Sequence, residues 1–445
     1  MYVADSRSNP STAATAAARD LGPGRRAAVA PTVLALGTVS LVTDVSSEMV
    51  TAVLPLYLVA GLGLSPLGFG LLDGVYNGFS ALVRLVGGHL ADRGGHHKTV
   101  AALGYGLSAL CKPLLLLASS LPMIGAVLAA DRTGKGLRTA PRDALISLAS
   151  PDESRGRAFG VHRAMDTAGA LIGPLVAFLI LRQAADGYDA VFTVSFCVAA
   201  VGVLVLLLFV PSRPSMPEPL ASPVPAPAPR ASLKAALGLL HIPDVRRLAL
   251  CALLLGLATV SDSFVYLLLQ RRLGVTDRWF ALLPIGTAAA FLLLAVPLGR
   301  LADRVGRWRV FLGGHGALLL VYGALLSGWQ SPALPYLVLA LHGCFYAATD
   351  GVLMAAAAGR IPSELRSSGL ALIQTGQALA RFGCSIAFGA AWTAWGDRWA
   401  IGAATAVLAV CAATSFALRP AADDDTNSGT ATPPPTATVS EEAPV

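Results

Sequence analysis

Long apolar segments recur along almost the whole chain and are separated by short polar loops. A helix needs about 20 mostly apolar residues to cross the hydrocarbon core of a bilayer, where its backbone polar groups must be paired internally. Six such segments lie in the first part of the chain, at 32–60, 65–91, 99–119, 122–147, 158–183 and 189–211. Six more follow at 248–270, 279–302, 309–328, 333–358, 367–395 and 398–418. The pattern predicts an all-α polytopic membrane protein with about 12 transmembrane helices.

Polar segments divide the chain into two halves with a tail at each end. We predict a disordered N-terminus over 1–31, a first six-helix half over 32–211 and a second six-helix half over 248–419. The proline-rich segment 212–247 is expected to connect the halves. The acidic segment 420–445 is expected to be disordered, because it has too few apolar residues to form a core.

Composition and charge agree with this pattern. Of all residues, 55% are hydrophobic and only 13% are charged, and the formal net charge is +7. Lys and Arg fall on alternate loops and not in one stripe, which indicates a membrane topology signal and no nucleic-acid-binding surface. Because positively charged loops face the cytoplasm, we expect both termini to be cytoplasmic and the chain to span the inner (plasma) membrane of a bacterial cell.

The two halves contain related segments. GHLADRGGHHK begins at Gly88 and GRLADRVGRWR begins at Gly299, an offset of 211 residues (299 minus 88). Pro151 and Pro362 begin a second pair of similar loops with the same offset (362 minus 151). Two matches in one register indicate an internal duplication, and hence two pseudo-symmetric six-helix halves.

These segments resemble the major facilitator superfamily, over about 32–418. The resemblance implies a fold of two six-helix halves with the substrate site at their interface. It also implies a gate at the loops after the second and eighth spans. The gating candidates are Gly88, Asp92, Arg93, Gly299, Asp303 and Arg304. A carboxylate at such a helix end can pair with basic groups across a cytoplasmic interface, and the alternative is a topology signal plus a helix turn.

The fourth and fifth spans carry two further motifs that resemble that family. Arg132 lies where other members have an arginine associated with proton coupling, and Lys135 stands where glutamine is commoner. The fifth span resembles the motif of the family's antiporters, which are mostly exporters. The residues of that motif are Gly160, Gly169, Gly173 and Pro174. The alternative is ordinary small-residue packing with a proline kink.

Ionisable side chains inside the predicted spans are functional candidates, because a charge at membrane depth usually faces a wet cavity or a partner. Asp44 and Glu48 lie one helical turn apart, and Asp44 is the leading candidate for a protonation site. Any positive charge left unpaired on the fourth span would favour an anionic or zwitterionic substrate. The candidates for the proton-coupling and substrate cavity are Asp44, Glu48, Arg132, Lys135, Asp166, Asp262 and Asp350.

The chain contains none of the enzyme, metal-site or phosphate-loop motifs that we sought, so we expect no catalytic activity, no metal and no cofactor. We predict a secondary active transporter that moves a small molecule by alternating access, as an exporter in exchange for protons. One alternative is a proton-coupled uptake symporter of an organic anion or other small solute. Another is a non-transporting membrane receptor or scaffold. A monomer in the lipid bilayer suffices for the transport mechanism.

Overall fold

A computed structural model shows that the described part of the chain is mostly helical. The described residues are 30–92, 97–150, 154–184, 187–211, 237–329, 331–362 and 365–418. Each of the 12 predicted spans is helical within these ranges, and no strand occurs in them. Residues 1–29 of the predicted N-terminus, residues 212–236 of the connector, the predicted tail and Arg93 lie outside the described residues.

The first half contains one helix for each predicted span. These helices are α1 (Pro31–Leu56), α2 (Pro66–Asp92), α3 (His97–Leu117), α4 (Leu121–Leu148), α5 (Arg155–Gln183) and α6 (Tyr188–Phe209). A short π-helical segment, η3 (Tyr57–Gly61), continues α1. Proline occupies the first turn of α1 and of α4, where its missing N–H group costs no hydrogen bond.

The second half is also helical, but two of its spans are interrupted. Its elements are η5 (Leu239–His241), α8 (Pro243–Leu257), α9 (Asp262–Leu273), α10 (Asp277–Phe280), α11 (Leu283–Val305), α12 (Arg307–Leu326), α13 (Leu334–Thr349), α14 (Val352–Ala358), α15 (Arg366–Trp395) and α16 (Asp397–Ala417). α8 begins inside the segment predicted as connector, because Pro243 and Asp244 form a favourable first turn. Nine helical stretches of the described chain are long and apolar enough to cross a membrane. By their length, α2, α4 and α15 complete the 12 spans.

The interruptions lie in the seventh and tenth spans. A short non-helical segment separates α8 from α9. Asp350 and Gly351 separate α13 from α14, with Gly351 in the left-handed region that favours glycine (φ 81°). Tyr322 on α12 compensates the first break: the Val260 N–H group donates to its hydroxyl oxygen (2.8 Å), and the hydroxyl donates to the Ala258 carbonyl (3.3 Å). Backbone groups freed from a helix at membrane depth need such partners.

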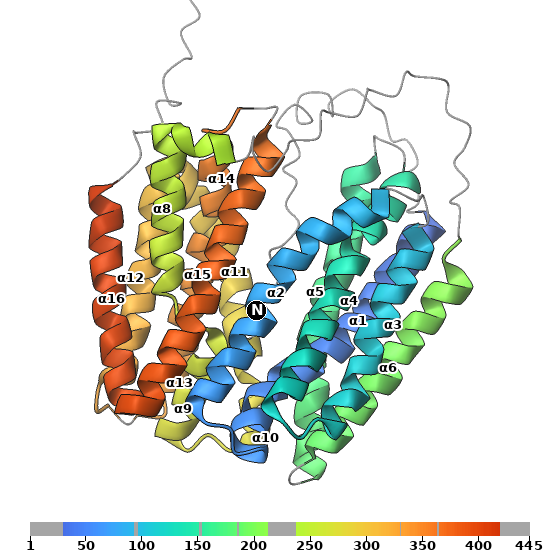
Figure 1. The fold of residues 1–445 in the computed structure, drawn as a ribbon, viewed down its shortest axis with the longest axis horizontal. Coiled ribbons are helices and arrows are strands. Elements are labelled where there is room, and N and C mark those ends of the chain that lie inside the picture. Colours follow the sequence, from blue (N-terminus) through green and yellow to red (C-terminus); the bar gives the residue numbers. More distant parts are fainter. Residues whose placement is uncertain are drawn as a thin grey trace, which may run out of the picture.

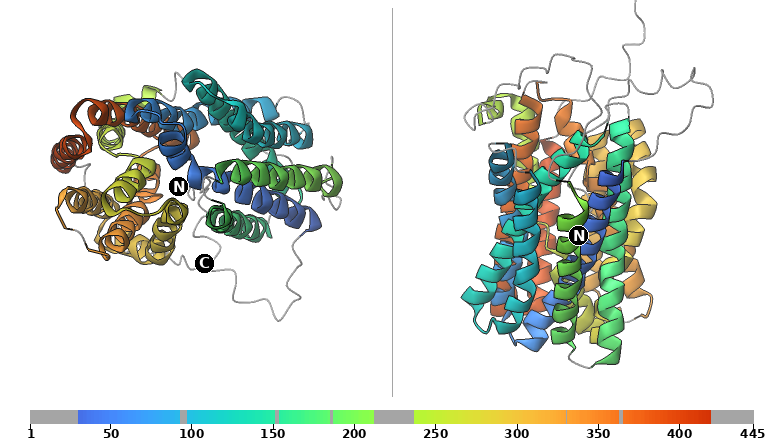
Figure 2. Two further views of the ribbon diagram at one scale, coloured as in Figure 1. Left: turned by 90° about the horizontal axis from the view of Figure 1, so that it is seen from below. Right: turned by 90° about the vertical axis from the view of Figure 1, so that its right-hand side faces the viewer.

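The helices form two bundles that stand side by side, α1 to α6 in one and α8 to α16 in the other (Figure 1, Figure 2). The bundles meet through α2 with α15 and through α5 with α10. Ring contacts also join the halves, between Phe69 and Phe264 (centroids 4.9 Å apart) and between Phe178 and Trp279 (5.2 Å). These contacts lie toward the end of the bundles where α2 begins and α15 ends, the lower end in Figure 1. The halves are therefore closed together at that end.

Replacing Tyr322 by Phe is expected to lower the free energy of unfolding by about 1–3 kcal/mol, since the buried Val260 N–H group loses its acceptor. The midpoint of thermal unfolding in detergent micelles measures the change. Tyr336→Phe is the matched control, because Tyr336 is 76% exposed. Equal midpoints for the two variants would contradict the role assigned to Tyr322.

Candidate functional site

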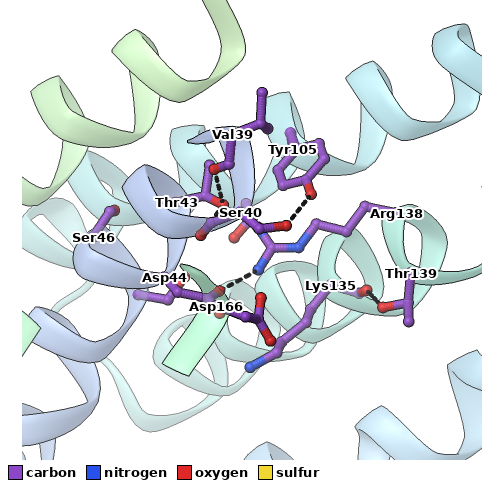
Figure 3. A network of polar contacts seen from close by, with 12 residues as sticks. Val39, Ser40, Thr43, Asp44, Ser46, Tyr105, Lys135, Arg138, Thr139 and Asp166 are labelled. Carbon is purple, nitrogen blue, oxygen red and sulfur yellow. Dashed lines mark hydrogen bonds and ion pairs between the residues drawn. The ribbon is translucent and has the colours of Figure 1, made fainter. Parts of the chain in front are cut away.

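A cluster of charged side chains lies where α1, α4 and α5 meet (Figure 3). Arg138 Nη2 on α4 lies 3.3 Å from Asp44 Oδ1 on α1. Asp166 on α5 lies beside Asp44, and Lys135 extends from α4 on the same side. The Arg138 guanidinium also stacks over the ring of Tyr105, 4.5 Å from its centroid. We call Asp44, Asp166, Lys135 and Arg138 the Asp44 cluster.

Glycines on α5 bring this cluster together. A Cβ atom on Gly169 would clash with the backbone of α1, and one on Gly173 would lie 2.8 Å from the Cβ atom of Glu48. Asp166 precedes Gly169 by about one helical turn, so the close approach of the two helices carries its carboxyl group to Asp44. Glu48 lies one turn further along α1, beside Gly173. Gly169 and Gly173 are thus close-packing residues, and the antiporter interpretation of the fifth-span motif stays a prediction.

Asp131 on α4 forms a second buried cluster. Its carboxylate accepts hydrogen bonds from Ser108 Oγ (2.6 Å) and Lys112 Nζ (3.1 Å) on α3. Arg132 donates to the same carboxylate through Nε (3.1 Å) and Nη2, and its guanidinium stacks over Tyr76 on α2 at 3.9 Å. The predicted coupling arginine therefore has its counter-ion in the neighbouring residue.

A third arginine on α4 is also paired. Arg142 lies 3.0 Å from Asp143 and 3.8 Å from Asp166. Arg132, Arg138 and Arg142 thus each lie within ion-pair distance of a carboxylate. Because the protein itself compensates these arginines, they do not by themselves supply the positive charge that would favour an anionic substrate.

The second half contributes a separate polar cluster at the start of α9. Tyr346 on α13 donates a hydrogen bond to Asp262 Oδ1, and His342 Nε2 lies 3.4 Å from the same oxygen. His342 is fully buried, and its ring packs against those of Tyr266 and Tyr346. Asp350 lies between α13 and α14. The structure thus places Asp262 and Asp350 at the two interrupted spans, where helix ends can line a transport site.

Some of the predicted gating residues lie outside the part of the chain that the structure describes. Gly88 and Asp92 belong to the last turns of α2, but the side chain of Asp92 and all of Arg93 lie outside the described residues. Near the end of α11 lie Gly299, Asp303 and Arg304. The Asp303 side chain is 68% exposed and lies 3.5 Å from Arg307, one turn away. In the described residues, this copy of the motif therefore forms a local ion pair.

Two further ionisable residues were not among the sequence-based candidates. Asp73 on α2 is 6% exposed and accepts a 2.7 Å hydrogen bond from Ser385 on α15. His162 on α5 is buried and bonds to Ser40 on α1, at 2.8 Å. Both are ionisable residues within predicted spans, which is the signal that pointed to Asp44. Applying that signal to every span would have found them.

Comparison with known proteins identifies the family. The model of the Major Facilitator Superfamily matches residues 36–383 and 248–441. The chain belongs to the major facilitator superfamily. An uncharacterized MFS-type transporter from Methanocaldococcus jannaschii is 30% identical over 370 residues, which are 80% of this chain and 87% of that protein. An uncharacterized protein from Mycobacterium tuberculosis is 35% identical over 186 residues, 42% of this chain and 45% of that protein. The family predicted from the sequence is confirmed, and it indicates a membrane transporter and not an enzyme.

Solved structures share the fold. The nucleoside transporter NupG has a TM-score of 0.72 at 14% identity, covering 87% of this chain and 99% of that chain. A bacterial homologue of the human lysosomal transporter Spinster, in an inward-facing and unoccupied conformation, has a TM-score of 0.68 at 17% identity, covering 87% and 96%. The predicted major facilitator fold is confirmed. At these identities the likeness concerns the fold and not the substrate.

Asp131→Asn is expected to destabilise the protein by about 3–5 kcal/mol, because the buried Lys112 and Arg132 lose the charge that they share. Thermal unfolding in detergent measures the loss. Asp303→Asn is the control, since that carboxylate is largely exposed. The role of Asp131 as shared counter-ion would be refuted if both variants melted at the same temperature.

A methyl group added to the fifth span is expected to act differently at two glycines. Gly169→Ala forces α1 and α5 apart and should cost about 1–3 kcal/mol. At Gly160 an added Cβ atom meets nothing within 4 Å, so Gly160→Ala should be neutral or slightly stabilising. Comparing unfolding midpoints of the two variants checks this. Equal unfolding midpoints would contradict the claim that close packing of α1 against Gly169 stabilises the protein.

Proposed function

We propose that this transporter is coupled to protons through the Asp44 cluster and works as an exporter. The observation that carries the coupling is the meeting of two carboxyl groups, on Asp44 and Asp166, beside Arg138 and Lys135. Ionisable side chains within the membrane are rare because a charge there costs free energy, and where they occur they usually mark a substrate or proton pathway. The substrate, a small molecule, would bind between the two halves, next to this cluster.

Two carboxyl groups in contact can share one proton, because two negative charges at that distance repel each other. Arg138 and Arg142 oppose the binding of a second proton, since each lies beside one of the two carboxyl groups. The pair can hold a proton in one conformation of the carrier and release it in another, in which water or the basic groups reach the carboxyl groups differently. Coupling requires such an alternation.

Export is supported by the resemblance of the fifth span to the antiporter motif. In an antiporter the proton and the substrate bind alternately, so binding of substrate near Glu48 would favour release of the proton from Asp44. A second candidate is the uptake of an organic anion together with protons. Lys135 favours this second candidate, because its ammonium group lies beside the two carboxyl groups of the cluster and a basic group attracts an anionic substrate.

The proposal includes an orientation in the membrane. Basic residues gather at the end of the bundles where α8 begins and α12 begins, among them Arg246, Arg247 and Arg309. The excess of basic residues assigns this end to the cytoplasm, and with it both termini of the chain. The contact between α2 and α15 then lies toward the outer side of a bacterial inner membrane. One chain acts as the transporting unit.

Substrate-driven proton movement in proteoliposomes tests the function. Vesicles that contain purified protein and a pH-sensitive dye are exposed in turn to lipophilic cations, organic anions and metal-chelate siderophores. Protons that move against the substrate support export by antiport, and protons that move with it support the second candidate. If no compound moves protons, the receptor or scaffold alternative gains support.

Asp44→Asn is expected to reduce substrate-driven proton movement to the level of protein-free vesicles, because the carboxyl group that takes up the proton is lost. The same dye assay measures it. Asp303→Asn changes an exposed carboxylate to an amide and is expected to leave the flux unchanged. Full flux in Asp44→Asn would remove Asp44 from the mechanism.

A further inference from the structure

Asp73 is a buried carboxyl group at the contact between the two halves. It lies two turns into α2 and accepts a 2.7 Å hydrogen bond from the hydroxyl of Ser385 on α15. This bond joins the two halves, whereas the ion pairs of Asp44 with Arg138 and of Asp131 with its partners stay within the first half. Separation of the halves at this end must break the bond to Ser385.

Glycines bring α2 and α15 into backbone contact around Asp73. Gly70, Gly74 and Gly78 follow at intervals of four on one face of α2. A Cβ atom on Gly70 would clash with the carbonyl oxygen of Ser385, and Gly74 and Gly78 pack against the side chain of Phe382 on the preceding turn of α15. This contact leaves little room for water, which agrees with the 6% exposure of Asp73.

The charged groups around Asp73 do not compensate an ionised carboxylate. At the start of α9 the neighbours are the hydroxyl groups of Ser261 and Ser263, which are uncharged, and Asp262, another acid; on α15 the neighbour is the thiol of Cys384. Arg381 lies about one turn before Ser385 on α15 and acts on Cys384, Tyr322 and His342, and it is not among the main groups that act on Asp73. α4 meets this part of α2 through Gly125. Among the described residues, no Lys, Arg or His side chain lies within ion-pair distance of Asp73.

An ionised carboxylate that is buried without a counter-ion is costly, and a neighbouring acid adds to the cost. A protonated carboxyl group can accept the bond from Ser385 without that cost. We propose that Asp73 is a proton-dependent latch of the outer side: the halves close there when Asp73 carries a proton and separate when it loses the proton. The proposal uses the orientation proposed above but not the assignment of Asp44.

The latch constrains the transport cycle in the same way for export and for uptake. Asp73 exchanges its proton with the outer medium when the halves are apart at this end. The outer side therefore closes after a proton has bound from outside, and the carrier that returns to the inward-open state is the protonated one. Closure depends on the outer pH, whichever substrate is carried.

The distance between labels on the outer ends of the two halves tests the latch. A keto amino acid at Leu62 and at Trp399 accepts a spin label at each position and leaves the six native cysteines unlabelled. Both positions are exposed, and they belong to different halves. Purified protein without substrate is measured at about pH 5 and about pH 9, which span the range for buried carboxyl groups. In the labelled protein that keeps Asp73 and Ser385, we expect a short distance between the labels at low pH and a long distance at high pH.

Two variants separate the carboxyl group from its hydrogen bond. Asp73→Asn is expected to keep the short distance at both pH values, because the amide is neutral and can still accept from Ser385. Ser385→Ala keeps the carboxyl group, so the response to pH remains, but the ratio of open to closed molecules rises about fivefold at each pH, the factor for one hydrogen bond. Ser195→Ala removes a buried bond to Ser46 inside the first half and is the matched control, with unchanged distances.

Three results would overturn the latch. They are a distance that does not respond to pH, a response that persists in Asp73→Asn, and an open fraction that is unchanged in Ser385→Ala. The third result decides even if Asp73→Asn fails to fold. Asp44→Asn is expected to keep the response of the distance to pH although it loses transport. Failure of the Asp44 cluster and failure of the latch therefore give different results.

Discussion

A charge within the hydrocarbon region of a bilayer needs a partner inside the protein, and the helices of the first half are joined where such partners meet. Arg138 on α4 lies against Asp44 on α1, while Lys112 on α3 shares Asp131 with Arg132. The Arg138–Asp44 pair links α1 to α4, and the Lys112–Asp131 pair links α3 to α4. Loss of one member would therefore loosen a contact between helices and leave an unpaired charge in the same place. The ion pairs that compensate the charges on α4 therefore also hold the helices of the first half together.

The second half meets a different requirement. Its seventh and tenth spans are interrupted, so it is backbone groups that need partners there. Tyr322 provides them at the first break, and Asp262 begins the helix that follows. The halves have the same number of spans and share the loop motif at Gly88 and Gly299, yet one is organised by ion pairs and the other by broken helices. Their pseudo-symmetry extends to the path of the chain and not to its internal chemistry.

The positions of the spans could be predicted because long apolar runs have few alternatives in a membrane. The breaks were not predicted, although Asp262 and Asp350 adjoin them, because a short polar segment inside a long apolar run does not by itself distinguish an interrupted helix from a continuous one. The pairing of charges depends on how each helix is rotated. The sequence places Arg132 and Arg138 in the fourth span and several carboxylates in the same and neighbouring spans, but only the structure pairs Arg132 with Asp131 and Arg138 with Asp44. Asp73 could have been found as an ionisable residue within a predicted span, but its hydrogen bond to Ser385 on α15, 312 residues away in sequence, could not.

The backbone contact between α2 and α15 also bears on how fast the carrier can turn over. Where helices interdigitate through large side chains, those side chains must leave their sockets before the helices can shift, and this raises the activation barrier. At Gly70 the two helices meet backbone to backbone, whereas the ring of Phe382 on α15 lies against Gly74 and Gly78. Around Gly70 one helix can move over the other without repacking large side chains, and Phe382 is the side chain that must shift. The barrier to opening at this end then arises from the polar contacts that break and from the movement of Phe382, and a single methyl group added at Gly70 is expected to slow the movement without touching any residue that binds substrate or proton.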